Sequence, residues 1–240
     1  MRQRGLILIV NYNQAVEIER YLSECLAHFS KDQLLVVDDG STDGSDRIAE
    51  SLGLKVLRHP KNRGIGAAIR TGLVAARDQG YQWILISSSN GKMVPAQFAG
   101  VYGPVDRGEV DFVQGSRYLA QDSNQGLPTF RRFAIPAFTL AVNLLLWMRL
   151  SDVTCGLRCY KLDLLGDPRV NLDQAWLDCY EMEYYLLYKF LKELRVKWVE
   201  VPVTIRYHHL EKGRKSKIVP FSGWWSMIRP FVFLTLGLRR

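Results

Sequence analysis

The chain has 240 residues, of which 48% are hydrophobic and 23% are charged, a composition that excludes a disordered chain and suits one domain. Its net charge is +8, and all of this excess arises after residue 190. A basic segment of this kind suits anionic lipid, a phosphorylated substrate or nucleic acid, and charge alone does not choose among them.

The cysteines form no CxxC pair and have no matching histidine cluster, which argues against a structural zinc site. We expect reduced thiols in a reducing compartment. The first apolar run, Leu6–Val10, is too short for a signal peptide. The sequence therefore predicts a cytoplasmic protein.

Short apolar runs alternate with amphipathic segments through the first half of the chain. We expect strands at Leu6–Val10, Leu34–Val37, Leu54–Leu57 and Trp83–Ser87, and helices at Ala15–His28, Asp43–Ser51 and Gly66–Gln79. This rhythm predicts an α/β fold, with a mostly parallel sheet covered by helices on both faces. Ligands of such folds bind beyond the carboxyl ends of the strands, so chemistry is expected just after Val10, Val37 and Ile86.

The second half is less regular. Pro128–Leu150 is strongly apolar, but a proline, an asparagine and an arginine interrupt it, so we do not expect it to span a membrane. Glu181–Leu194 predicts a helix, and Lys197–Tyr207 predicts one or two strands. The final apolar and aromatic run, Phe221–Leu234, is flanked by basic residues.

One predicted strand ends in two carboxylates, Asp38 and Asp39, after which Gly40 turns the chain toward a helix. Carboxylates at a strand end accept hydrogen bonds from a ribose diol or a base edge. Asp and Gly are also common in turns and helix caps. The local pattern therefore fits both a nucleotide site and a plain turn.

Three segments, NYNQAVEIERYL, VVDDGSTDGS and HPKNRGIGAAIRTGL, resemble the donor-binding half of family 2 glycosyltransferases in their order and spacing. Among these enzymes the chain is most similar to the polyprenyl-phosphate sugar synthases, such as the dolichyl-phosphate mannose synthases. The resemblance implies the GT-A fold and a nucleotide-sugar donor. It places Asn11 and Asn13 near the base, and Asp38 and Asp39 on the base and ribose.

The Gly64-Ile-Gly66 segment superficially matches a dinucleotide fingerprint. It does not follow the first strand, and Gly72 is misplaced for the third glycine of that motif. We expect a loop and a helix start that pack near the donor instead.

Similar sequences carry a DxD motif after the fourth strand, whose carboxylates hold a divalent ion, Mg²⁺ or Mn²⁺, on the donor diphosphate. Here Ser88 and Asn90 occupy these positions, and neither supplies the negative charge that a hard cation requires. Two alternatives follow. The protein is non-catalytic and binds a nucleotide, a lipid or a partner, or it is a metal-independent enzyme in which Lys92 supplies part of the metal's charge. Lys92 also fits a solvated loop lysine.

The resemblance also suggests an acceptor side. Arg117, in the segment GSRY, is implied at the phosphate of a lipid acceptor, and Arg131 and Arg132 lie where similar sequences place a second acceptor arginine. The forked guanidinium suits phosphate oxygens, and each position also fits an ordinary surface arginine. Asp152 either orients the acceptor or caps a turn. The late basic motif that contains Arg214 and Lys217 is implied over the donor diphosphate, and it equally fits a lipid-headgroup patch. Lys92, Arg117 and Asp152 are the catalytic candidates, and no metal ligand is predicted.

Trp224 and Trp225 beside basic residues favour a segment that lies in a membrane interface. Pro128–Leu150 fits a second such element, and both segments also fit packing in the protein core or in a dimer contact.

Together these patterns predict one domain over 1–240, with a nucleotide-sugar half (1–117), an acceptor half (118–218) and an amphipathic C-terminal tail (219–240). The expected reaction moves a sugar from a GDP- or UDP-sugar to a polyprenyl phosphate, either dolichyl or undecaprenyl. The protein is expected to be peripheral at the cytoplasmic, inner face of the membrane, with a membrane-protein partner. The basic tail is interleaved with apolar residues and matches no nucleic-acid motif, so nucleic acid is not an expected partner.

Overall fold

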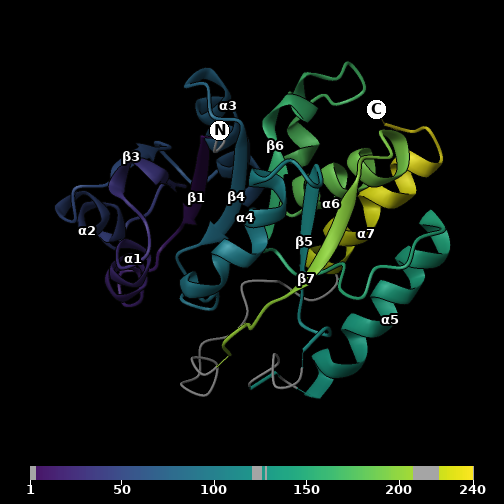
Figure 1. Cartoon of the computed structure of the whole chain (residues 1–240), viewed down its shortest axis with the longest axis horizontal. Helices are drawn as coiled ribbons and strands as arrows, with labels where there is room; N and C mark the ends of the chain where they lie inside the picture. Colours follow the sequence, from purple (N-terminus) through teal and green to yellow (C-terminus); the bar gives the residue numbers. More distant parts are fainter. Residues whose placement is uncertain (1–3, 121–125, 128, 208–221, 240) are drawn as a thin grey trace.

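The structure, a computed structural model, describes residues 4–120, 126–127, 129–207 and 222–239, without the side chains of 222–224. Within these residues one seven-stranded sheet forms the centre of the protein (Figure 1). Its strands lie in the order β3-β2-β1-β4-β6-β5-β7. Their bounds are β1 Gly5–Asn11, β2 Leu34–Asp38, β3 Lys55–Arg58, β4 Trp83–Ser88, β5 Phe112–Ser116, β6 Arg158–Lys161 and β7 Trp198–Pro202.

The first four strands are parallel, as the alternating sequence pattern predicts. β1 and β2 are buried along their whole length, which explains why their sequences are continuous apolar runs. The register pairs Asn11 of β1 with Asp38 of β2, and Val10 of β1 with Ser88 of β4. The polar residues Asn11, Asp38 and Ser88 therefore lie together at the carboxyl ends of these parallel strands. Each predicted strand of this half lies within a residue or two of its observed bounds.

The sheet continues past β4 through β6, which is antiparallel to both β4 and β5. β7 then runs parallel to β5. The sheet is therefore mixed but mostly parallel, and it spans both the predicted donor half and the predicted acceptor half of the chain. The sequence analysis predicted β7 but neither β5 nor β6.

Helices cover both faces of the sheet. On one face α3 (Ile65–Asp78) and α6 (Glu181–Tyr188) pack on the apolar side chains, together with residues of α7 (Ser222–Thr235). The other face is covered by α1 (Ile18–Leu26), α2 (Ser45–Ser51) and α4 (Phe98–Asp106). These two layers confirm the expected α/β architecture.

The predicted helix at Glu181–Leu194 is α6 continued by a π-helical turn, Lys189–Glu193. α7 contacts α6, and its Phe231 and Leu234 are buried in the same core. Part of the apolar C-terminal segment therefore packs into the protein. Ile228 and Trp225 of the same helix stay partly exposed.

The apolar stretch near residue 140 forms α5, Thr129–Leu146, which lies at the periphery of the molecule (Figure 1). Its mean hydropathy is 1.2 and only 22% of it is buried, so by length and composition it is the one described helix that passes a test for a membrane span. Ile135, Val142 and Leu146 pack inward. The opposite side of α5 carries exposed apolar side chains.

Candidate functional site

The carboxyl ends of β1 and β2 are joined by a buried polar cluster around Asn11. Its side-chain nitrogen donates to Asp38 Oδ1 at 2.6 Å and to Ser45 Oγ at 2.8 Å. Its oxygen accepts from Ser89 Oγ at 2.6 Å. Asn11 thereby links the ends of three elements, and its polar atoms are occupied inside the protein.

Asp38 and Asp39 both lie beneath loops. The Asp38 carboxylate accepts from the backbone N–H of Ser41 at 2.9 Å and from its hydroxyl at 2.6 Å. Asn13, at φ 49°, accepts from the backbone N–H of Thr42 at 2.9 Å. These bonds fix the turn after β2 against the loop after β1.

Asp39 organises the following loop. Its oxygens accept from Asn62 Nδ2 at 2.9 Å and from the backbone N–H groups of Arg63 and Gly64 at 2.9 and 2.8 Å. His59 Nδ1 lies 2.7 Å from the same carboxylate. Asp39 is 1% exposed, so it supports the loop at residues 59–64 from below.

The start of α3 needs glycines because the backbone near Leu177 and Asp178 packs closely against it. Gly64 has φ 106°, which side chains rarely adopt, and a Cβ on Gly66 would lie 1.9 Å from the carbonyl oxygen of Leu177. The backbone N–H of Ala67 donates to Asp178 O at 3.0 Å. As expected, the Gly-Ile-Gly segment begins a helix beside the site and is not a dinucleotide turn.

A pocket of about 190 Å³ opens at this edge of the sheet. It brings together five of the predicted residues, which lie on β4, the loop after it, the end of β5 and α5: Ser88, Asn90, Lys92, Arg117 and Arg131. Asn11, Asn13, Asp38 and Asp39 do not line it. They shape the loops next to it.

Lys92 is largely buried at the pocket wall. Its backbone N–H donates to Asn90 Oδ1 at 3.1 Å, and its carbonyl accepts from Arg206 N at 2.8 Å. The ammonium lies 5.7 Å from the ring centre of Tyr207. Burial, followed by the charges of Arg131 and Arg117, lowers the pKa of Lys92 to about 8.

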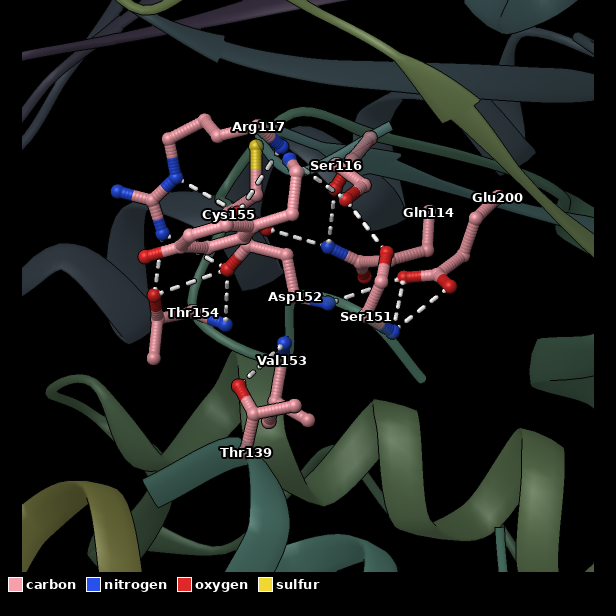
Figure 2. A network of polar contacts seen from close by, with 12 residues as sticks. Gln114, Ser116, Arg117, Thr139, Ser151, Asp152, Val153, Thr154, Cys155 and Glu200 are labelled. Carbon is pink, nitrogen blue, oxygen red and sulfur yellow. Dashed lines mark hydrogen bonds and ion pairs between the residues drawn. The ribbon is translucent and has the colours of Figure 1, made fainter. Parts of the chain in front are cut away.

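Arg117 forms a buried ion pair with Asp152 (Figure 2). Its Nε and Nη2 donate to the two carboxylate oxygens at 2.6 and 2.8 Å. Nη1 donates to Tyr207 Oη at 2.5 Å, and Nη2 also bonds Thr154 Oγ1. Burial lowers the pKa of Arg117, but Asp152 outweighs it, so the guanidinium stays charged.

The loop that carries Asp152 is itself held from the sheet. Glu200 of β7 accepts from the backbone N–H groups of Ser151 at 2.8 Å and of Asp152 at 3.1 Å (Figure 2). Ser151 Oγ lies 2.6 Å from Ser116 Oγ of β5. Strands β5 and β7 therefore fix the position of the ion pair.

Glu183 of α6 also lines the pocket, and the sequence analysis did not select it. Burial raises the pKa of this carboxyl, and Arg158, whose Nη1 lies 3.8 Å away, opposes the rise. The sequence signal that could have revealed Glu183 is its charge, which interrupts the apolar residues of the predicted helix Glu181–Leu194. In a pocket lined by cations, Glu183 is a hydrogen-bond acceptor.

Three further predicted residues are Arg131, Arg214 and Lys217. Arg131 lies on α5 and lines the pocket, and its assignment to the acceptor phosphate stays a prediction. Arg214 and Lys217 lie outside the described residues, so their assignment to the donor diphosphate stays a prediction.

Comparisons with known proteins agree with this arrangement. The sequence model of the family described as Glycosyl transferase family 2 matches residues 6–165. Polyprenol monophosphomannose synthase of Mycolicibacterium smegmatis is 26% identical over 220 residues, which cover 89% of this chain and 82% of that protein. Undecaprenyl-phosphate mannosyltransferase of Micrococcus luteus is 27% identical over 218 residues, covering 89% and 88%.

Among solved structures, glucosyl-3-phosphoglycerate synthase from Mycobacterium tuberculosis, in complex with Mg²⁺ and uridine diphosphate, superposes with a TM-score of 0.68 at 17% identity. The match covers 99% of this chain and 81% of that one. At this identity the likeness concerns the fold, which is GT-A.

Proposed function

Because the chain belongs to glycosyl transferase family 2, we propose that it moves a sugar from a nucleotide-sugar donor to a polyprenyl phosphate. The observation that carries the proposal is the pocket in which Lys92, Arg117 and Arg131 converge. A reaction between a nucleoside diphosphate sugar and a lipid phosphate brings two anionic groups to one place, and it needs such a set of cations. Two relatives named for transfer to polyprenyl phosphates support the acceptor class.

The donor base and ribose are assigned to the surface formed by the loops after β1 and β2. Asn13 and Thr42 lie on that surface, and Asp38 and Asp39 hold it from below. Asp39 then acts through the loop it organises.

The acceptor phosphate is assigned to Arg131, beside the Arg117–Asp152 pair. An acceptor phosphate oxygen attacks the anomeric carbon, the bond from that carbon to the diphosphate oxygen breaks, and its electron pair leaves with the nucleoside diphosphate. This direct displacement inverts the anomeric configuration. The phosphate is already ionised, so no general base is required, and Asp152 serves as a positioning residue for Arg117.

Glu183 is assigned to the hydroxyl groups of the transferred sugar. It is the one carboxylate among the described residues that line the pocket, and no described residue donates a hydrogen bond to it. Sugar hydroxyls are donors that match such a group.

A membrane surface supplies the lipid acceptor, and α5 is assigned to it. Phe133 is 75% exposed, Leu144 69% and Trp147 90%. Arg132 and Arg149, near the two ends of the helix, are also exposed and suit anionic headgroups. The protein would then lie peripherally at the cytoplasmic face of the membrane, where nucleotide sugars are the donors. The proposal includes a membrane-protein partner.

The test uses purified full-length protein with polyprenyl phosphate in liposomes and with GDP- and UDP-sugars in turn. Formation of a lipid-linked sugar supports the proposal. Nucleotide binding without any product, with magnesium, with manganese and with EDTA, supports the alternative of a non-catalytic protein. Ser88 and Asn90 favour that alternative, because they lack the expected carboxylates.

A further inference from the structure

The loop after β4 does not offer the ligands of a divalent cation. Asn90 turns its Oδ1 back to the N–H of Lys92, at 3.1 Å. Ser88 is neutral, and among the described residues no cluster of three or more His, Cys, Asp or Glu side chains could hold a metal. Mg²⁺ and Mn²⁺ prefer charged oxygen ligands. The described residues at this position therefore do not fit the ion seen in the Mg²⁺ complex of the structural relative.

The last residue of β4 and the loop after it present two hydrogen-bond donors to the pocket, Ser88 and Lys92. Ser88 Oγ is buried at the pocket wall and has no hydrogen-bond partner among the residues that the structure describes. A buried hydroxyl without a partner is costly, unless a ligand completes its bonding. The nearby ammonium of Lys92 is the second donor, and no described carboxylate forms an ion pair with it.

The backbone holds Lys92 in place from both sides. Gly91, at φ 72°, makes the turn between Asn90 and Lys92. After it, Met93 forms a β-bridge with Ile205, and Arg206 donates to the carbonyl of Lys92. A largely buried ammonium that no described carboxylate pairs is costly to keep charged, so an anion that enters the pocket gains a partner on a fixed backbone.

We propose that the Lys92 ammonium, assisted by the Ser88 hydroxyl, binds the donor diphosphate in the place where a divalent cation would otherwise stand. This inference rests on the proposed nucleotide-sugar donor. When the anomeric bond breaks, the electron pair moves onto the diphosphate oxygen, and Lys92 neutralises the developing charge without giving up its proton. A lysine suits this task because its charge is compact. Arg117 and Arg131 add positive charge around the same pocket.

The first experiment measures the binding of UDP and of GDP by calorimetry, in EDTA and then with Mn²⁺ or Mg²⁺. Equal affinity with and without metal is expected. Lys92→Met should weaken binding at least tenfold, while Lys55→Met, at an exposed lysine far from the pocket, should not change it. Binding that disappears in EDTA and returns with Mn²⁺, or unchanged affinity in Lys92→Met, overturns the inference.

The second experiment restores the acidic motif with the variant Ser88→Asp/Asn90→Asp/Lys92→Gln. Its nucleotide binding should depend on Mn²⁺, and the Mn²⁺ electron paramagnetic resonance signal should broaden on addition of UDP beyond that of Mn²⁺ and UDP alone. The wild type should show no such extra broadening. A wild-type signal that broadens as much as the variant's contradicts the inference. Thermal unfolding confirms that both proteins are folded.

These measurements separate this inference from the proposed reaction. Metal-independent nucleotide binding without sugar transfer leaves the Lys92 site intact and contradicts the reaction. Sugar transfer that requires a metal supports the reaction and contradicts the Lys92 site.

Discussion

The guanidinium of Arg117 and the carboxylate of Asp152 face each other through two hydrogen bonds, and their side chains are only 5% and 0% exposed. A buried charge that loses its partner remains uncompensated in a medium of low polarity. The pair therefore makes the stability of the loop before β6 depend on a single carboxylate.

Replacement of Asp152 by Asn tests this dependence. The free energy of unfolding should fall by about 3–5 kcal/mol, measured by urea denaturation. Asp173→Asn, at an exposed position, should change it by less than about 0.5 kcal/mol. The double variant Asp152→Asn/Arg117→Met should recover part of the loss. If Asp152→Asn is as stable as Asp173→Asn, the ion pair between Arg117 and Asp152 is not buried as described.

Lys92 should make the stability of the free protein depend on pH. Its pKa falls from 10.5 to about 8 on folding, so between these values the unfolded state binds more protons and stability rises with pH. The positive charges of Arg131 and Arg117, which share its pocket, add to the lowering of this pKa, and burial raises the pKa of Glu183 in the same pocket.

Lys92→Met removes this effect. At pH 7 the variant should be more stable than the wild type by up to about 3 kcal/mol, because each pKa unit corresponds to about 1.4 kcal/mol. The difference should shrink from pH 8 to pH 10, and thermal melts across this range measure it. A variant that is less stable than the wild type at pH 7 would contradict the cost of burying this ammonium without a described carboxylate beside it.

Two glycine substitutions form a matched pair. Gly66→Ala should destabilise the protein by about 1–3 kcal/mol, because the new methyl group overlaps backbone oxygens of Leu177 and Cys179. Gly100→Ala, in α4, meets open space and should stabilise it by about 0.5–1 kcal/mol. Denaturant midpoints compare the two, and the same sign for both would refute the close approach at α3.

The exposed face of α5 should govern attachment to lipid. Phe133→Ser/Leu144→Ser/Trp147→Ser should reduce sedimentation with liposomes that contain anionic lipid, because the apolar surface that enters the interface is lost. Val16→Ser, 75% exposed in the loop before α1, is the control and should sediment normally. If the triple variant sediments as well as this control, α5 is not the attachment surface.

Glu183→Gln should separate binding of the sugar from binding of the nucleotide. The affinity for the matching nucleotide sugar should fall by about tenfold, or about 1.4 kcal/mol, and the affinity for the nucleoside diphosphate should stay the same. Calorimetry with the two ligands gives both values. A parallel fall for both would assign Glu183 to the diphosphate or to the fold.

The first half of the fold was predictable from sequence, because β1, β2 and β4 are apolar runs separated by amphipathic helices. β5 and β6 were not predicted, since they contain Gln114 and Arg158, which read as surface residues. In the structure these two side chains pair across the strands, with Arg158 Nε 2.7 Å from Gln114 Oε1. Apolar periodicity does not reveal a polar pair that is buried between strands.

The candidate site was likewise predictable only in part from the sequence. Motifs led to Lys92 and Arg117, both of which line the pocket. They could not reveal that Asp152 is enclosed by Arg117, or that Glu183 reaches the pocket from a helix more than sixty residues beyond Arg117. Such relations arise from the packing of α6 and of the loop before β6, and not from local spacing.

The reversed direction of β6 has a consequence for how this architecture can diversify. Because β6 is antiparallel to β4, its beginning lies at the edge where β4 ends, and the loop at residues 151–157 enters the pocket without any extra helix or insertion. If the proposed assignment of the two sides of the site holds, changes in that short loop alter the chemistry offered to the acceptor and leave the loops after β1 and β2 untouched. On that assignment, acceptor choice and donor choice can evolve as separate traits on one continuous sheet.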